Sequence, residues 1–328
     1  MVDRALAVAA LAVAIFFICR RRGAGMRHVS CEANKPPAAV QATACGLPGR
    51  WERRFENGPA MAAAFLEHGV VVLRGFIGPG DVADHLDSIS SLIMSLPQRE
   101  GLGQFPKEHI MYDDVSRPGT LKQIQQLADK CDPIATLIRE RLMPVATALL
   151  GEPAVLKNVQ YFDKPPTQLY AEGDGSKGTP AHQDAHYFTI EPPHTAVTMW
   201  LALDEADLEN GCLRYEATLA DKVRPHRFSD VMGFSQTLVE YSAAGGPLEV
   251  AVPAMPGDLI CHHSRMVHRA GPNTTATRHR RALGAIFYGA SSCVDEAAHA
   301  QRAAEIRQRA MQLEGQQGCT VAHGNSLP

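Results

Sequence analysis

Four stretches of the chain have the pattern of helices. Apolar residues recur at helical spacing in Pro59–His68 and Asp81–Leu96, the run Ile134–Leu150 stops at Gly151, and Val294–Leu313 is polar and rich in Ala, Gln and Arg. A spacing of three or four residues places apolar side chains on one face, as an amphipathic helix requires, and a glycine commonly ends a helix. We therefore expect three helices in the first half of the chain and one near its end.

Short apolar runs dominate residues 154–289, where Gly, Pro, Asn and Asp separate them. The β-branched run Gly69–Phe76 predicts one buried strand before them. The later runs are AVLKNVQYF, HQDAHYF, TAVTMWLAL, GCLRYEA, LEVAVPA, DLICHH and RALGAIFYG. Many short strands with turn signals between them are typical of a β-sandwich or barrel. Together with the helices they predict an α+β fold, in which a jelly-roll core of two sheets is flanked by helices.

The first residues form a separate segment. Ala5–Cys19 is apolar throughout and is followed directly by three arginines. As a helix it would span about 22 Å, which is less than the roughly 30 Å of a bilayer core. The arginines favour a membrane anchor with the rest of the chain facing the cytosol; an organelle-targeting segment or a soluble cytoplasmic protein is the alternative. Residues 1–30 are taken as this segment, and the Ala-, Pro- and Gly-rich residues 31–50 as a linker.

Composition narrows the function classes. The chain of 328 residues has 32 basic and 35 acidic side chains, a net charge of −3, and 45% hydrophobic residues. This ordinary globular composition excludes a disordered chain and a polytopic membrane protein. Without an excess of positive charge, nucleic acid is not an expected partner. The eight cysteines are scattered and form no CxxC pair, so free thiols are expected rather than a disulfide framework or a cysteine zinc site.

His182 and Asp184 have the spacing of two metal ligands. In a strand, residues i and i+2 point to the same face, so the imidazole and the carboxylate would converge. His268, which precedes a turn signal, fits as the third ligand, and His262 and His263 compete with it. Two histidines and one carboxylate form a facial triad that leaves three positions on Fe(II) open for a chelating cosubstrate and O₂. A hydrolytic zinc site uses similar ligands, so the triad by itself does not select the metal.

Arg280 and Arg281 provide a partner for an anionic cosubstrate. A guanidinium group holds a carboxylate through two parallel hydrogen bonds, as the far end of a 2-oxo acid would require. Neighbours in a strand face opposite ways, so only one of the two arginines can point inward.

These motifs together resemble the phytanoyl-CoA dioxygenase family of iron(II)- and 2-oxoglutarate-dependent oxygenases. The matching text is HQDAHYF at 182–188, TAVTMWLALDEADLENGCL at 195–213, GDLICHHSRMVHRAGPN at 257–273 and RRAL at 280–283, with LKQIQ at 121–125 and VQYFDKPP at 159–166 upstream. An isolated HxD pair is a weak signal. The ordered series of blocks over most of residues 60–290 makes the resemblance specific.

The resemblance implies a fold, a domain and a reaction. The fold is the double-stranded β-helix, a cupin-like jelly roll, which would occupy residues 51–293 and be followed by a C-terminal helix and tail at 294–328. The reaction is hydroxylation of a small-molecule or lipid-like substrate, coupled to decarboxylation of 2-oxoglutarate to succinate and CO₂, with Fe(II) and O₂. The carboxylate of Asp184 favours hydroxylation over halogenation. The oligomeric state is left undetermined by the sequence.

The resemblance also implies roles for single residues. The iron ligands would be His182, Asp184 and His268. The residues that contact 2-oxoglutarate would be Lys122, Gln160, Trp200 and Arg280. Arg281 stays open as the alternative to Arg280.

Arg269 departs from the family pattern, which usually reads HGSGPN at the distal histidine, whereas this chain reads HRAGPN. A large cation at that position would lie beside the iron or in its access channel. A non-catalytic barrel that binds a metal or ligand, with Arg269 blocking the site, therefore stays open as a second function. A metal-dependent hydrolase or isomerase stays open as a third, because the ligand set also suits zinc.

Overall fold

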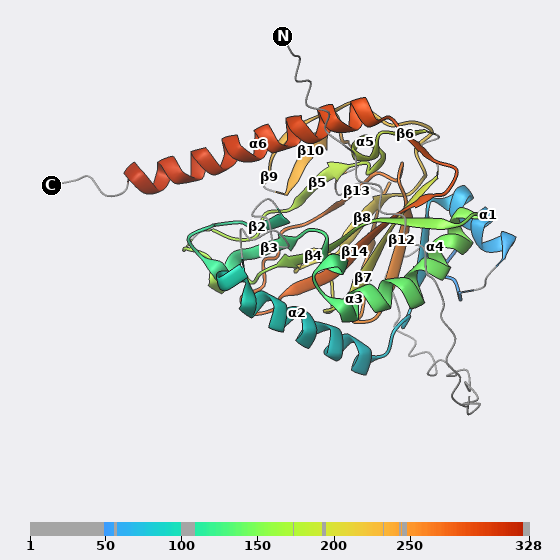
Figure 1. Ribbon diagram of the computed structural model, residues 1–328, viewed down its shortest axis with the longest axis horizontal. Coiled ribbons are helices and arrows are strands. Elements are labelled where there is room, and N and C mark those ends of the chain that lie inside the picture. Colours follow the sequence, from blue (N-terminus) through green and yellow to red (C-terminus); the bar gives the residue numbers. More distant parts are fainter. Residues whose placement is uncertain are drawn as a thin grey trace, which may run out of the picture. The chain divides into compact units, whose positions relative to one another are not determined.

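The computed structural model describes residues 49–55, 58–99, 109–172, 174–191, 195–231, 233–242, 244 and 248–323. All of them belong to one compact unit, residues 39–328 (Figure 1). The helices are α1 (Pro59–His68), α2 (Pro79–Arg99), α3 (Asp132–Leu137), α4 (Met143–Leu150), α5 (Ala185–Phe188) and α6 (Glu296–His323), with the π turn η4 (Ile138–Leu142) and the 3₁₀ turns η2 (Pro118–Thr120), η3 (Leu127–Asp129) and η5 (Thr167–Leu169). The strands are β1 (Val70–Leu73), β2 (Ile110–Tyr112), β3 (Leu121–Ile124), β4 (Ala154–Lys164), β5 (Thr179–His182), β6 (Ile190–Glu191), β7 (Ala196–Ala202), β8 (Leu213–Glu216), β9 (His226–Val231), β10 (Phe234–Leu238), β11 (Glu249–Val252), β12 (Leu259–His263), β13 (His268–Ala270), β14 (Arg280–Gly289) and β15 (Cys293–Val294).

A seven-stranded antiparallel sheet, in the order β1-β12-β7-β14-β4-β3-β2, forms the larger layer. Alternate side chains of its strands face opposite ways. In β7, Val197, Met199 and Leu201 belong to the core cluster shared with α1 to α4, whereas Trp200 belongs to the cluster on the other face. Figure 1 shows α2, α3 and α4 along the outer side of this sheet. Because both faces are covered, these strands read as nearly continuous apolar runs.

A four-stranded antiparallel sheet, in the order β11-β8-β13-β5, forms the smaller layer. Its inward side chains, among them Tyr215 and Leu213 of β8, pack in one cluster with Trp200 of the larger sheet. The hairpin of β9 and β10 lies beside β5, where Thr237 donates a hydrogen bond to the backbone oxygen of Ala181. Two facing sheets with flanking helices confirm the predicted α+β jelly roll.

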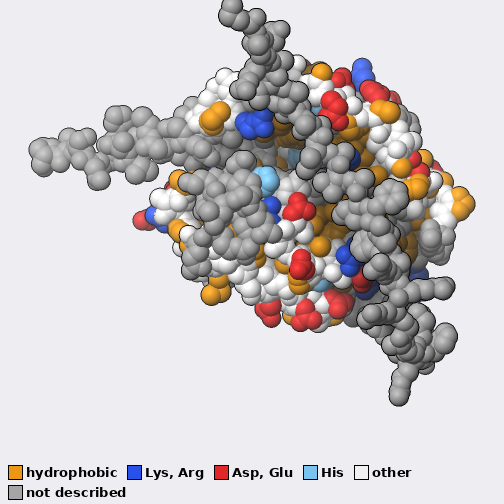
Figure 2. Space-filling model, viewed as in Figure 1, with side chains coloured by type: hydrophobic (Ala, Val, Ile, Leu, Met, Phe, Trp, Pro, Cys, Tyr) orange, Lys and Arg blue, Asp and Glu red, His pale blue; other side chains and the backbone are white. Residues whose placement is uncertain are grey.

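The predicted helices are present, with two changes. The stretch Ile134–Leu150 is not one regular helix, because the π turn η4 separates α3 from α4. The last helix extends to His323. Acidic side chains gather along the lower edge of the face in Figure 2, where Figure 1 places α2; the exposed face of that helix carries Asp81, Asp84 and Asp87.

Several strands were not predicted. They are the two of the segment 110–124, β2 and β3, the two of the hairpin 226–238, β9 and β10, and the short strands β6, β13 and β15. β9 is largely exposed and polar, so its sequence HRFSDV carries little of the apolar signal that marks a strand.

The predicted localisation, a membrane anchor with a cytosol-facing domain, is wrong by this structure. Among the described helices, none combines the length and the apolar composition needed to cross a bilayer. The sequences of the two long helices, α2 and α6, both include acidic and basic residues. The apolar run Ala5–Cys19, on which the prediction rested, lies outside the described residues.

Candidate functional site

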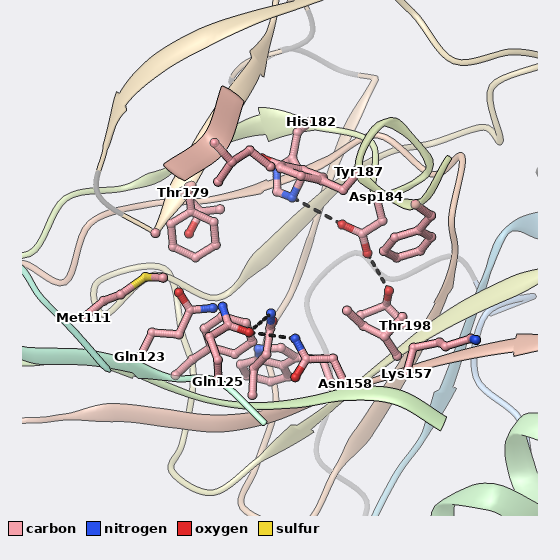
Figure 3. Close-up of a pocket in the computed structure, with 18 of the residues that line it drawn as sticks. Met111, Gln123, Gln125, Lys157, Asn158, Thr179, His182, Asp184, Tyr187 and Thr198 are labelled. Atoms are coloured by element: carbon pink, nitrogen blue, oxygen red, sulfur yellow. Dashed lines mark hydrogen bonds and ion pairs between the residues drawn. The ribbon is translucent and has the colours of Figure 1, made fainter. Parts of the chain in front are cut away.

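A cavity of about 580 Å³ lies between the two sheets. All the residues to which the sequence assigned a role line it; they are Lys122, Gln160, His182, Asp184, Trp200, His268 and Arg280. In Figure 3, His182 and Asp184 lie on one side of the cavity, and Gln123, Gln125, Asn158 and Thr198 lie on the other, with Thr198 hydrogen-bonded across to Asp184.

The structure brings His182, Asp184 and His268 together. Each offers one ligand atom, and the three atoms lie within 4.8 Å of one another. Nε2 of His182 is 3.4 Å from Oδ1 of Asp184, and Nε2 of His268 is 3.7 Å from the same oxygen. All three side chains are nearly buried. Two nitrogens and one oxygen around one point are the donor set of a facial triad.

Strand pairing explains how residues 86 positions apart meet. His182, the last residue of β5, stands directly opposite His268 of β13 in the antiparallel ladder. The prediction that His182 and Asp184 converge as strand neighbours is wrong in its mechanism. β5 ends at His182, and Asp184 has helical backbone angles (φ −61°, ψ −33°) at the start of α5. The turn from strand to helix, rather than a strand pleat, directs the carboxylate at the imidazoles.

Backbone oxygens hold both imidazoles with Nε2 free for a metal. Nδ1 of His182 donates to the oxygen of Pro180 (2.7 Å), and Nδ1 of His268 donates to that of Met266 (3.0 Å). An imidazole that donates through Nδ1 keeps its Nε2 lone pair, which is the arrangement typical of metal-bound histidines. Burial and the neighbouring His182 and His262 lower the pKa of His268 well below its ordinary value, so its ring is neutral.

The charge of Asp184 is also stabilised. Burial acts to raise the pKa of the Asp184 carboxyl, yet the neighbouring imidazoles of His268, His182 and His262 hold that pKa well below its ordinary value. Its second oxygen, Oδ2, accepts hydrogen bonds from Thr198 (2.5 Å) and from Nε2 of His262 (3.1 Å). Thr198 was not predicted, and His262 was predicted only as a competing ligand. Neither role has a local sequence signal, because both arise from the facing strands β7 and β12.

Three buried cations gather at one end of the cavity. Lys122 pairs with Asp113 (Nζ to Oδ1, 2.8 Å), Lys164 donates to the backbone oxygen of Lys177 (2.8 Å), and Nε of Arg280 has no hydrogen-bond partner among the described residues. Burial, Arg280 and Lys122 lower the pKa of Lys164 well below its ordinary value, and burial lowers that of Arg280 to about 10. Buried like charges are costly unless an anion compensates them.

Aromatic and amide side chains complete this end of the cavity. The guanidinium of Arg280 lies 5.5 Å from the ring centre of Trp200, a cation–π contact. Gln160 donates to Gln125 (2.8 Å), which also accepts from Asn158 (2.6 Å; Figure 3). The sequence singled out Gln160 and not its two amide neighbours.

The structure separates the two candidate arginines, of which the family resemblance favoured Arg280 and left Arg281 as the alternative. Arg280 is buried in the cavity, whereas Arg281 points to the opposite side and forms two hydrogen bonds, each 2.8 Å long, with the carboxylate of Asp204.

The expectation that Arg269 lies beside the metal is wrong. Its guanidinium is bound by Glu249 at 2.5 and 2.7 Å, because Arg269 and His268 are strand neighbours with opposite directions. Arg269 therefore does not obstruct the cavity, and the argument for a blocked, non-catalytic barrel is removed.

Comparison with known proteins agrees with this geometry. The model of the family described as Phytanoyl-CoA dioxygenase (PhyH) matches residues 65–282, which lie inside the predicted oxygenase domain. The peroxisomal phytanoyl-CoA dioxygenase of Bos taurus is 20% identical over 76% of this chain and 76% of its own. A 2-aminoethylphosphonate dioxygenase from the uncultured bacterium HF130_AEPn_1 is 28% identical over 66% of this chain and 76% of its own.

Solved structures resemble the fold as well. The non-heme α-ketoglutarate-dependent epimerase SnoN from nogalamycin biosynthesis aligns with a TM-score of 0.54 and 26% identity, over 71% of this chain and 83% of its own. EctD from S. alaskensis, solved with 2-oxoglutarate and 5-hydroxyectoine, aligns with a TM-score of 0.55 and 20% identity, over 71% of this chain and 77% of its own. These similarities support the double-stranded β-helix fold.

Proposed function

Since the chain belongs to the phytanoyl-CoA dioxygenase family, it is a dioxygenase that uses iron(II), 2-oxoglutarate and O₂, and we propose that it hydroxylates a small-molecule or lipid-like substrate in the cavity described above. The observation that carries the proposal is the placement of a two-histidine, one-carboxylate cluster next to three buried cations in one cavity.

We assign His182, Asp184 and His268 as the iron ligands. Nε2 of the two imidazoles and Oδ1 of the carboxylate face one point, so they fit a divalent metal. The ligand set would hold iron(II) with positions left open, which 2-oxoglutarate and O₂ would need. The chemistry that the iron centre supplies when bound is the oxidative decarboxylation of 2-oxoglutarate to succinate and CO₂, with the second oxygen atom going to the substrate as a hydroxyl group.

We assign the far carboxylate of 2-oxoglutarate to Arg280, with help from Lys122. The guanidinium is buried, lies against Trp200 and has an unpartnered Nε, so a carboxylate would satisfy it. Gln160 contributes a neutral hydrogen-bonding group on the adjacent strand β4. Burial of these groups excludes water, which strengthens every charge interaction in the cavity.

The remainder of the cavity is proposed to hold the substrate. Its wall combines aromatic and aliphatic side chains with polar groups; Tyr187, Phe188, Ile286, Tyr288 and Ile306 are among the former, and Asn158, Gln125 and Lys157 among the latter. A concave, mostly apolar site with a few polar groups is typical of small-molecule binding. It suits an amphipathic molecule better than a fully polar one. The intact carboxylate of Asp184 favours hydroxylation over halogenation.

A spectroscopic titration tests the proposal. Anaerobic protein receives Fe(II) and then 2-oxoglutarate, and the visible charge-transfer absorption of the chelate is recorded for the wild type, His182→Ala and the control His68→Ala at the end of α1. We expect the absorption in the wild type and in His68→Ala, and its loss in His182→Ala. Absence of the absorption in the wild type at saturating 2-oxoglutarate would refute the proposal.

A further inference from the structure

A hydrogen-bonded chain of three buried side chains ends on the carboxylate of Asp184. The hydroxyl of Tyr215 lies 3.0 Å from Nδ1 of His262, and Nε2 of His262 lies 3.1 Å from Oδ2 of Asp184. Tyr215 is fully buried and His262 is 2% exposed. Tyr215 comes from β8 of the smaller sheet and His262 from β12 of the larger one, so the chain spans both layers.

The direction of each hydrogen bond follows from the chemistry of the groups. A carboxylate oxygen only accepts, so Nε2 of His262 carries the hydrogen in its contact with Asp184. Nδ1 of the same ring lies within hydrogen-bond distance of the Tyr215 hydroxyl, which is placed to donate to it. An Nε2 that carries hydrogen and points at Asp184 is not available as a metal ligand. The ring of His262 nevertheless lies only 4.3 Å from that of His268, centre to centre.

The second oxygen of Asp184 is therefore saturated. Oδ2 accepts from Thr198 (2.5 Å) and from His262 (3.1 Å), whereas Oδ1 faces Nε2 of both His182 and His268. A carboxylate that binds a metal through both oxygens takes two coordination positions, and one that binds through a single oxygen takes one. Because two hydrogen-bond donors already occupy Oδ2, binding of a metal through Oδ1 alone is favoured.

We propose that His262 and Tyr215 are positioning residues that restrict Asp184 to one coordinating oxygen and thereby keep three metal positions open. This inference rests on the proposed metal site. It assigns His262, a competitor for the third ligand by sequence, to the support of a ligand instead. Tyr215 acts one step further away, because it fixes which nitrogen of His262 carries the hydrogen.

The test measures metal binding rather than turnover. Fe(II) affinity is determined anaerobically by competition with a coloured chelator, and the visible spectrum of the Co(II)-substituted protein reports the coordination number. The variants are His262→Leu, which removes the donor, His262→Gln, whose amide keeps a donor, and Tyr215→Phe, which removes only the hydroxyl. The control is His263→Gln, the next residue of β12, whose ring packs on Phe65 on the helical side of the sheet.

We expect His262→Leu to weaken Fe(II) binding about 10- to 100-fold and to change the Co(II) spectrum, since loss of such supporting contacts commonly has that effect. Tyr215→Phe should change the Fe(II) affinity and the Co(II) spectrum in the same direction, but by less. His262→Gln should have values close to those of the wild type. The control His263→Gln should leave both measurements unchanged. Circular dichroism of each variant confirms that it is folded.

Two outcomes would overturn the inference. Wild-type affinity and spectrum in His262→Leu would show that the hydrogen bond does not shape the site. Equal loss of metal in His262→Leu and His262→Gln, with Tyr215→Phe unchanged, would make His262 a metal ligand. Failure of the proposed function is distinguishable, because the wild type itself would then show no Fe(II) and 2-oxoglutarate absorption.

Discussion

Arg280 and Arg281 are neighbours in β14, yet their side chains lie on opposite faces of the larger sheet. Arg280 is 4% exposed and lies over Trp200 in the cavity, whereas Arg281 binds Asp204 at the other side. At the scale of single residues, the alternation of a strand therefore separates a proposed binding group from a structural ion pair.

This difference predicts distinct effects for two matched substitutions. Arg280→Met removes a charge-assisted hydrogen-bond donor and should weaken 2-oxoglutarate binding to the Mn(II)-loaded protein about 10- to 100-fold, which corresponds to about 1.5–3 kcal/mol. Arg281→Met should leave that affinity within about threefold and lower the stability by about 1 kcal/mol or less, since its ion pair is partly exposed. Isothermal titration and urea unfolding measure the two quantities. Equal loss of affinity in both variants would contradict the assignment.

No role was assigned from the sequence to Lys164, which precedes two prolines. The structure buries it directly across the β4–β14 ladder from Arg280, with a carbonyl oxygen as its hydrogen-bond acceptor. Like charges opposite one another in a sheet are unfavourable. The unfavourable placement of Lys164 opposite Arg280 is explained if the cavity binds a dianion, which would compensate both positive charges.

Lys164→Met should therefore have two effects of opposite sign. The ligand-free protein should become more stable by about 1 kcal/mol, because a buried charge is replaced by an apolar side chain of similar length. The affinity for 2-oxoglutarate should fall about tenfold. Lys157→Met, at the exposed rim of the cavity, is the control and should change neither quantity appreciably. A less stable Lys164→Met protein would show that the lysine is structural.

At the scale of elements, the junction between β5 and α5 sets the ligand geometry. Gln183, between the two ligand residues, is fully buried; its side chain donates to the backbone oxygens of Lys222 and Arg265 and accepts from the backbone N–H of Arg224. Its own N–H donates to Nε2 of His226 (3.1 Å). These contacts fix the point at which the strand becomes a helix.

The contact with His226 predicts a pH dependence of stability. Burial lowers the pKa of His226 to about 4, from an ordinary value of 6.5. Above pH 6.5 the residue is neutral in both the folded and unfolded states. As the pH falls from 6.5 towards 4, the unfolded chain binds a proton that the folded protein excludes, so stability falls in this window.

His226→Gln keeps an acceptor for the Gln183 N–H but does not titrate. The loss of stability between pH 7 and pH 5 should therefore be smaller in this variant than in the wild type, by about 1 kcal/mol, since solvent screens a partly exposed group. Urea unfolding at both pH values measures the difference, with His68→Gln as the control. The same loss in wild type and His226→Gln would contradict the expected role.

At the scale of the whole molecule, the site joins the two sheets. His182 and His268 belong to the smaller sheet, whereas Thr198, Trp200 and Arg280 belong to the larger one. A metal with its cosubstrate would contact both layers at once, and a ligand that binds only the folded state stabilises it.

Thermal unfolding should reflect this connection. Mn(II) and 2-oxoglutarate together, each at about 100 times its dissociation constant, should stabilise the protein by at least about 2.7 kcal/mol and raise Tm by several degrees. His268→Ala should lose the response to both ligands, while Arg280→Met should keep the response to Mn(II) alone. No increase of Tm in the wild type would count against a metal site between the sheets.

The sequence by itself was sufficient for the helices, most strands of the core, the three candidate ligands and the family resemblance, because apolar periodicity and motif spacing are local properties of the chain. It was misleading about HQDAHYF, where apolar and polar alternation resembles a strand although the chain turns into α5. It did not predict β9, since its residues are mostly exposed.

Only the tertiary structure decided which groups surround the proposed ligands. Thr198, Tyr215 and His262 are 14 to 78 residues away from Asp184 in sequence. The register of facing strands places Thr198 and His262 at the Asp184 carboxylate, and Tyr215 at His262. The same register selected Arg280 over Arg281, turned Arg269 towards Glu249 and placed Lys164 beside the cavity. Hydrogen bonds and charge interactions depend on distances between strands, and no local pattern in the sequence specifies those distances.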